Sequence, residues 1–303
     1  MNQWKIYAML VFVMFAWGAN VSLLKYMVEE VPPATLTAFR IFVAGLVVLP
    51  IIWKMKLLRK PMPSEWKYIL LGTLTNVVVH HYFLNMGLSL TSATHGGLIL
   101  GTGPMLTAIS AAIILKYFPT RVQWLGLVFG LTGIAVSILV GSETMGANLG
   151  DFYVFLSIFV QVLSFLVVSK ASKTLDPRLL TVYMLLIGSV ILFIISLIQE
   201  PGAIKQFSTT TPTPTFWTIF LSSAIVCTAI GHLMYNYAVG QAGATKAAIF
   251  MNLNPLFSLI ISALFLGEVL RLNHFLGLIL IVTGVTLGSG AAEDIWKKRK
   301  RMQ

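Results

Sequence analysis

The chain has 303 residues, of which 57% are apolar and only 10% are charged, and its formal net charge is +11. Soluble globular domains carry about 25% charged residues, so this composition, with a mean hydropathy of +0.87, excludes a soluble protein. The single cysteine, Cys227, excludes a disulfide framework and a zinc site built on several cysteines.

Ten apolar stretches follow one another along the chain, and each approaches the roughly 20 residues that a helix needs to cross a bilayer. They cover residues 5–26, 34–53, 66–86, 92–115, 121–140, 149–170, 179–198, 215–239, 244–266 and 272–290. The stretches are too long for β-barrel strands and do not alternate. We therefore expect an all-α integral membrane protein with ten transmembrane helices. The first stretch is too long for a signal peptide and is expected to be retained.

The basic residues indicate how these helices are oriented. Most of them fall within or beside residues 54–67, 116–121, 170–178 and 297–301, which lie on one side if ten helices alternate. By the positive-inside rule, both termini are cytoplasmic. The basic tail, residues 291–303, either fixes this topology or binds anionic lipid. Since either role accounts for the basic excess, no nucleic-acid partner is expected.

An internal repeat divides the chain into two five-helix halves, residues 1–145 and 146–290. Aligning residues 81–133 with 232–284 needs no gap and pairs rare residue types. These pairs include His81 with His232, Asn85 with Asn236 and Pro104 with Pro255. Because five is an odd number, the second half starts on the opposite membrane face and is inverted. Inverted repeats are typical of alternating-access carriers, which bind substrate near the midplane between the halves.

Short motifs in both halves resemble the drug/metabolite transporter superfamily, specifically its ten-helix EamA-type members. The motifs are Phe15-Ala16-Trp17-Gly18-Ala19-Asn20, Pro32-Pro33, Phe39-Arg40-Ile41, Ala93-Thr94, Ala244-Thr245-Lys246-Ala247, Asn254-Pro255 and Phe265-Leu266-Gly267-Glu268. One departure is Lys116-Tyr117, which stands where the second half has Gly267-Glu268. The resemblance implies a multi-pass protein of the bacterial inner (cell) membrane that exports amino acids or other small metabolites.

Polar side chains at membrane depth usually face a protein interior or a wet cavity, so they are candidates for substrate binding. Arg40 lies about 10 Å into its helix; it either binds a substrate carboxylate or bonds to carbonyls of a neighbouring helix. His81 and Asn85 share one helix face at i, i+4, and His232 and Asn236 repeat that face. These four residues either line a central cavity or hold helices together.

Further candidates flank these positions. Trp17 and Asn20 face together at i, i+3, and Gln161 falls in the matching region of the second half. Tyr235 precedes Asn236, and Asn252 stands beside an expected proline kink. The alternative is that the aromatic residues among them only fill helix interfaces.

Two further expectations concern His80 and the repeated prolines. His80 is turned about 100° from His81 and is expected to contact a helix rather than the cavity. Pro104 and Pro255 are expected to interrupt their helices, either as gate hinges or as static bends.

The sequence predicts a secondary transporter of small organic metabolites, with membrane lipid around it. The chain has no clearly mid-span carboxylate and no Walker motif, so we expect no cofactor and no metal. Gly126 and Gly130 mark either a homodimer face or a contact within a monomer. The alternatives are a membrane-embedded enzyme that acts on lipid through His80, His81 and His232, and a lipid scramblase or passive channel.

Overall fold

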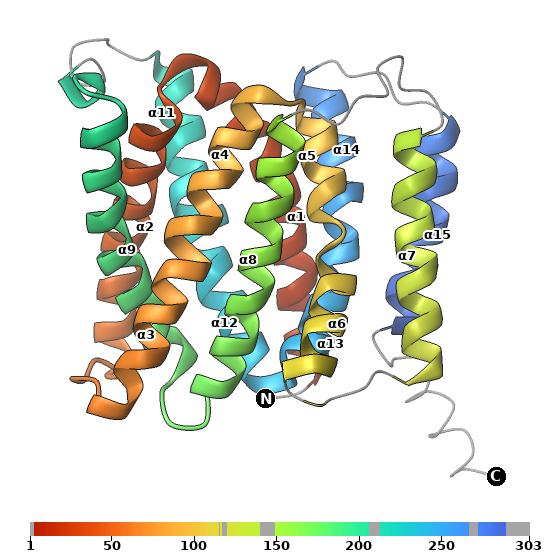
Figure 1. The fold of residues 1–303 in the computed structure, drawn as a ribbon, viewed down its shortest axis with the longest axis horizontal. Helices are drawn as coiled ribbons and strands as arrows, with labels where there is room; N and C mark the ends of the chain where they lie inside the picture. The colour runs from red at the N-terminus through yellow and green to blue at the C-terminus, as the bar shows by residue number, and fades with distance from the viewer. Residues whose placement is uncertain are drawn as a thin grey trace.

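The computed structural model describes residues 3–114, 116, 120–139, 149–205, 213–266 and 272–288, and within these ranges the chain forms helices and turns without a strand (Figure 1). The basic tail 291–303 and the Gly267–Arg271 segment lie outside the described residues. The elements are α1 (Gln3–Glu30), α2 (Pro33–Lys54), η1 (Pro63–Glu65), α3 (Trp66–Gly72), η2 (Thr73–Val79), α4 (His80–Leu90), α5 (Ala93–Leu100), α6 (Gly103–Ile114), α7 (Arg121–Leu139), α8 (Leu149–Ala171), α9 (Pro177–Gln199), α11 (Pro214–Leu221), η3 (Ser222–Ile230), α12 (Gly231–Ala242), α13 (Ala244–Ile249), η4 (Phe250–Asn252), α14 (Leu253–Leu266) and α15 (Leu272–Gly288).

Seven helical segments of the described chain are long and apolar enough to cross a membrane. They are Gln3–Glu30, Pro33–Lys54, Ala93–Ile114, Leu149–Ala171, Pro177–Gln199, Pro214–Ala242 and Ala244–Phe265. The other three expected stretches are also helical, over residues 66–90, α7 and α15. Many large apolar side chains, such as Ile113, Leu264 and Ile198, point outward. Such a surface suits lipid rather than water, as expected for a multi-pass membrane protein.

The second helix of each half has the same local structure. Helices α2 and α9 both begin with a proline, which suits the first turn because its missing N–H has no helical acceptor there. In α2, Thr37 donates to the carbonyl of Pro33, and Asn85 of α4 donates to the Thr37 hydroxyl. In α9, Thr181 donates to the carbonyl of Pro177 at 2.8 Å, and Asn236 of α12 donates to Thr181 at 2.9 Å. The repeated histidine helices are therefore attached to equivalent helices by equivalent hydrogen bonds.

Helices α2 and α9 pack against each other in antiparallel directions and are joined at both ends. At one end, the Glu200 carboxylate that follows α9 accepts from the backbone N–H groups of Ala34 and Thr35, at 2.9 and 2.8 Å. It thereby caps the start of α2, where unpaired N–H groups and the helix dipole favour an anion.

The opposite end of this pair is joined by Arg59, in the segment after α2. Its guanidinium donates to both carboxylate oxygens of Glu65, at 2.8 and 2.7 Å, and to the carbonyl of Thr174 at 3.1 Å. The Tyr183 hydroxyl of α9 donates to the Arg59 carbonyl at 2.7 Å. The hydrogen bonds from Arg59 hold the pKa of the Glu65 carboxyl below its ordinary value.

Two π-helical segments occupy equivalent places, and the sequence analysis did not predict them. The segment η2 ends just before His80 and η3 ends just before Gly231, so each precedes one of the repeated histidines by the same spacing. π-Helical stretches are rare, occur mostly as short interruptions of α-helices and are frequently found at functional sites. Here each one packs against the other half's second helix, η3 on α2 and η2 on α9.

The two proline-containing helices are both interrupted, as the sequence predicts. A turn at Gly101 and Thr102 separates α5 from α6, and Pro104 is the second residue of α6. In the second half, the short 3-10 helix η4 separates α13 from α14, and Pro255 is the third residue of α14. The prolines therefore stand in the first turn after each break rather than in mid-helix. Their role as hinges remains a prediction.

Helices α7 and α15 lie against each other at one edge of the bundle (Figure 1). A Cβ atom added to Gly284 would come within 2.6 Å of the Gly126 oxygen and the Gly130 nitrogen. The glycines thus permit close approach of two helix backbones within the chain. The face that Gly126 and Gly130 form is covered by α15.

Candidate functional site

A small cavity of about 30 Å³ lies between the two halves. This volume suffices for about two water molecules. Its lining combines polar and apolar side chains from both halves. They are Trp17, Asn20, Val21, Leu24, His80, His81, Leu84, Leu100, Gln161, Cys227, Thr228, His232, Met251 and Asn254. Five of the predicted site residues, Trp17, Asn20, His81, Gln161 and His232, are therefore brought together here.

Arg40 lies directly behind this lining. It is fully buried and donates through Nη1 to the Thr228 hydroxyl at 2.5 Å and through Nη2 to His81 Nδ1 at 3.2 Å. Both of its partners line the cavity. Within the described part of the chain, no carboxylate forms an ion pair with Arg40. Arg40 thus places an unneutralised positive charge one side chain away from the cavity.

The contact with Arg40 determines which ring nitrogen of His81 carries the proton. A guanidinium can only donate hydrogen bonds, so His81 Nδ1 must accept and carries no proton. In the neutral ring the proton is then on Nε2, which is buried and lacks a partner among the described residues. His81 therefore presents an unused N–H donor at the cavity wall, next to the arginine charge.

His80 makes the expected helix contact, with α8, but it also lines the cavity, so the expectation that it lies away from the cavity is wrong. Its Nδ1 lies 2.7 Å from the Ser157 hydroxyl, and its Nε2 lies 2.9 Å from the Gln161 amide nitrogen. The rings of His80 and His81 have centroids 4.6 Å apart. Although 100° apart on the helix, the two neighbours reach the cavity from either flank of α4, where α8 holds His80 on one side and α2 holds His81 on the other.

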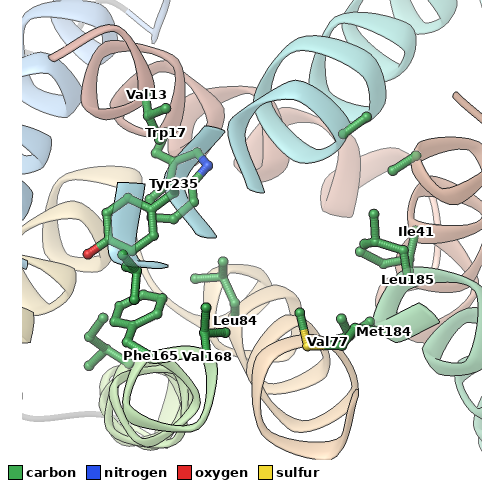
Figure 2. Packing of buried hydrophobic residues seen from close by; sticks show 14 of the residues in the cluster. Val13, Trp17, Ile41, Val77, Leu84, Phe165, Val168, Met184, Leu185 and Tyr235 are labelled. Carbon is green, nitrogen blue, oxygen red and sulfur yellow. The ribbon is translucent and has the colours of Figure 1, made fainter. Parts of the chain in front are cut away.

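Aromatic rings close one wall of the cavity. Trp17, Tyr235 and Phe165 follow one another in Figure 2, with the ring centroid of Tyr235 at 4.9 Å from that of Trp17 and at 4.7 Å from that of Phe165. The ring centroid of His232 lies 5.2 Å from that of Trp17. The Trp17 indole N–H donates to the carbonyl of Cys227 at 2.9 Å, so the indole is fixed. His81 and His232 complete the wall, with centroids 5.1 Å apart.

Four other predicted residues lie near the cavity but do not line it. Asn85 and Asn236 hold α4 and α12 to the threonines of α2 and α9, so the structure places them in helix contacts. Tyr235 is fully buried behind Trp17. The Asn252 amide lies about 3.0 Å from where a Gly130 Cβ would stand, against α7. Any direct contact of these four with a substrate remains a prediction.

The structure adds three polar lining residues that the sequence analysis did not select as candidates, Cys227, Thr228 and Asn254. Thr228 lies four residues before His232 and Asn254 directly precedes Pro255; those spacings from repeated residues are the signal by which they could have been found. The described residues contain no group of three histidine, cysteine or acidic side chains that could hold a metal ion.

Helices long enough to span a membrane and a polar cavity between two similar halves are typical of membrane transporters. Comparison with known proteins makes the assignment specific. Residues 4–139 and 148–289 each match the EamA-like transporter family. The chain belongs to this family, within the drug/metabolite transporter superfamily, as its motifs indicated.

Relatives cover nearly the whole chain. The uncharacterized transporter YyaM of Bacillus subtilis (strain 168) is 31% identical over 96% of this chain and 95% of its own length. The WAT1-related protein At3g02690, chloroplastic, of Arabidopsis thaliana is 26% identical over 90% of this chain and 65% of its own length. A chain of a solved crystal structure has a TM-score of 0.77 and 15% identity, covering 94% of this chain and 96% of that one. This last likeness concerns the fold alone.

Proposed function

We propose that the chain is a secondary transporter that exports small organic metabolites, amino acids among them, across a bacterial inner membrane by alternating access. In this proposal it has ten transmembrane helices in two inverted five-helix repeats, residues 1–145 and 146–290, with both termini in the cytoplasm. The supporting observation is the cavity lined by α1, α4 and α5 of one half and by α8, η3, α12, η4 and α14 of the other.

The paired structural features favour a carrier over a static pore. Each half supplies one π-helical segment and one broken helix around the cavity. The equivalent helices α2 and α9 pack antiparallel, which is what inverted repeats require. Rocking of the halves about these elements would expose the cavity first to one side and then to the other.

The function can be tested in two steps. Purified protein is first screened by thermal unfolding against metabolites, since a ligand that binds the native state raises the melting temperature. Each stabilising solute is then followed into and out of proteoliposomes. The proposal predicts saturable flux and acceleration by solute on the opposite side. Flux that grows linearly with concentration, single-channel currents or lipid scrambling without solute flux would contradict it.

A further inference from the structure

The most unusual group in the molecule is a buried cation without an anion. Arg40 is fully buried in a membrane-spanning helix, and the described chain offers it a hydroxyl and an imidazole but no carboxylate. A buried charge is costly unless an opposite charge and further hydrogen bonds compensate it. The uncompensated charge of Arg40 therefore points to an interaction with an anionic group that does not belong to the described part of the chain.

The unused hydrogen-bond donors of this cluster show what is missing. The Nε–H of Arg40 and the Nε2–H of His81 are both buried and lack acceptors among the described residues. Thr228 accepts from Arg40 and donates to the carbonyl of Ser223 at 2.9 Å, so its proton is already used. The cluster has surplus donors and a surplus positive charge. An anionic oxygen group would accept hydrogen bonds from these donors and would balance the positive charge.

Packing alone does not explain the arginine, because the equivalent contact, of η2 on α9, is built without one. Arg40 is the eighth residue of α2 and Met184 is the eighth residue of α9. Thr228 precedes His232 by four residues, as Val77 precedes His81. Val77 and Met184 point into the same space where η2 packs on α9 (Figure 2). The scaffold thus accommodates an apolar pair at this position.

The rest of the lining limits the solute to one negative charge and an apolar portion. Among the described residues that line the cavity there is no lysine or acidic side chain, and Val21, Leu24, Leu84 and Met251 line it together with Trp17. A second anionic charge would find no partner here. A planar carboxylate with two acceptor oxygens matches neighbouring guanidinium and imidazole donors.

We infer that the Arg40–His81–Thr228 cluster is the carboxylate-binding end of the site, and that the solute is a monocarboxylate with an apolar portion, amino acids included. This inference rests on the proposed function and narrows its substrate class. Arg40 attracts the carboxylate, His81 donates to it, and the apolar wall at Trp17 holds the remainder of the solute.

The experiment compares four carboxylates with their primary amides: 4-methylpentanoate, 3-phenylpropanoate, leucine and phenylalanine. Each amide keeps the shape and loses the negative charge. The measurement is the concentration that gives half of the maximal rise in melting temperature of the purified full chain. We expect at least one carboxylate to act at a concentration about tenfold or more below that of its amide, because a charge-assisted hydrogen bond exceeds a neutral one by that factor.

Three variants show whether Arg40 causes the preference. The double variant Arg40→Met with Thr228→Val copies the apolar pair Met184 and Val77 of the equivalent contact, so it should fold and lose the preference for carboxylates. Arg40→Lys keeps the positive charge but lacks the planar set of guanidinium donors. It should weaken binding while retaining the preference for carboxylates. Met184→Leu, at the equivalent position of the other half, is the matched control and should bind as the unaltered chain does.

Several results would overturn the inference. They are equal stabilisation by carboxylates and amides, stabilisation by none of the four carboxylates, retained preference in the double variant, and an Arg40-dependent stabilisation by sodium chloride that equals that of the carboxylates. Proteoliposome flux separates this failure from failure of the proposed function. A neutral solute carried with saturable kinetics would preserve the transporter and refute the carboxylate site.

Discussion

The two halves build the same helix contact twice and fill it with different chemistry. Where η3 packs on α2, a fully buried arginine meets Thr228 and His81. Where η2 packs on α9, the equivalent positions hold Met184 and Val77 (Figure 2). The hydrogen bonds from Thr37 and Thr181 that surround these positions are retained in both halves. The scaffold is therefore repeated, whereas the polar groups that we propose to bind a carboxylate are not.

A second pair of equivalent contacts, Gln161 with His80 and Trp17 with Gly231, also differs in chemistry. Gln161 of α8 bonds to His80 at 2.9 Å. At the equivalent positions, Trp17 of α1 faces Gly231, where an added Cβ would come within 2.7 Å of the indole nitrogen. Each of the two equivalent contacts joins the first half to the second, and one is made by hydrogen-bonding groups whereas the other presents a flat indole ring. The two-fold scaffold therefore encloses a cavity whose two sides differ in chemistry.

The largest loss of stability is expected when an arginine is placed in the apolar contact between η2 and α9. Met184→Arg places a buried charge beside Val77, which cannot accept a hydrogen bond. An uncompensated buried charge costs about 3–5 kcal/mol, so the melting temperature of the purified protein should fall sharply. Met184→Leu is the control and should cost less than about 1.5 kcal/mol. If Met184→Arg melted at the temperature of the unaltered chain, the contact between η2 and α9 would not be a dry, apolar environment.

A smaller loss is expected from removing one partner in the polar contact. Thr228→Val leaves Nη1 of Arg40 without an acceptor, which costs about 1–3 kcal/mol. Adding Arg40→Met should restore much of that loss, because the pair then matches Met184 and Val77. A double-mutant cycle of thermal unfolding measures this coupling. Additive losses would mean that the two side chains do not interact.

Sequence reasoning predicted the scaffold better than the site, and particular residues show why. The alignment of the two halves pairs His81 with His232 and Pro104 with Pro255. Because a membrane composition rarely repeats these residue types by chance, the internal repeat and the two helix breaks could be predicted. The π-helical segments η2 and η3 have no marker in composition, so the local turn of the helix before each histidine could not be predicted. The position of His80 at the cavity could not be predicted, because a turn of about 100° around a helix does not separate neighbours whose side chains both reach the same small cavity.

The hydrogen bonds of Asn85 and Asn236 could not be predicted for a related reason. Repetition indicates that a residue matters to both halves, and a structural role in each half repeats as readily as a binding role. Their bonds to Thr37 and Thr181 depend on how α4 and α12 pack on α2 and α9. Tertiary packing, rather than the spacing within one helix, decides which polar residues face the cavity.

At the ends of the α2–α9 pair, a moderate effect is expected from Glu200→Ala. The variant removes the acceptor of the Ala34 and Thr35 N–H groups and leaves the start of α2 uncapped. The loss of a cap costs about 1–2 kcal/mol, and the melting temperature should fall accordingly. Glu200→Gln keeps one acceptor oxygen and should lose less. Equal losses in both variants would contradict a capping role.

The smallest effect is expected at the other end, from Glu65→Gln. Because the Arg59 hydrogen bonds lower the pKa of Glu65, its contribution to stability is fully present above the unfolded pKa of about 4.3. That contribution is lost as pH falls through the lower folded value. The unaltered chain and the variant should therefore differ most near pH 7 and converge at acidic pH. A difference that grew on acidification would contradict this sign.

The central claim is that the cavity opens alternately to the two membrane faces, and the single cysteine tests it directly. Cys227 is buried and lines the cavity, so a small membrane-impermeant thiol reagent reaches it only when the cavity opens. Right-side-out and inside-out vesicles should both label Cys227 slowly, a bound solute should slow both reactions, and Cys227→Ser should remain unlabelled. Labelling from one face only, or from neither, would contradict alternating access.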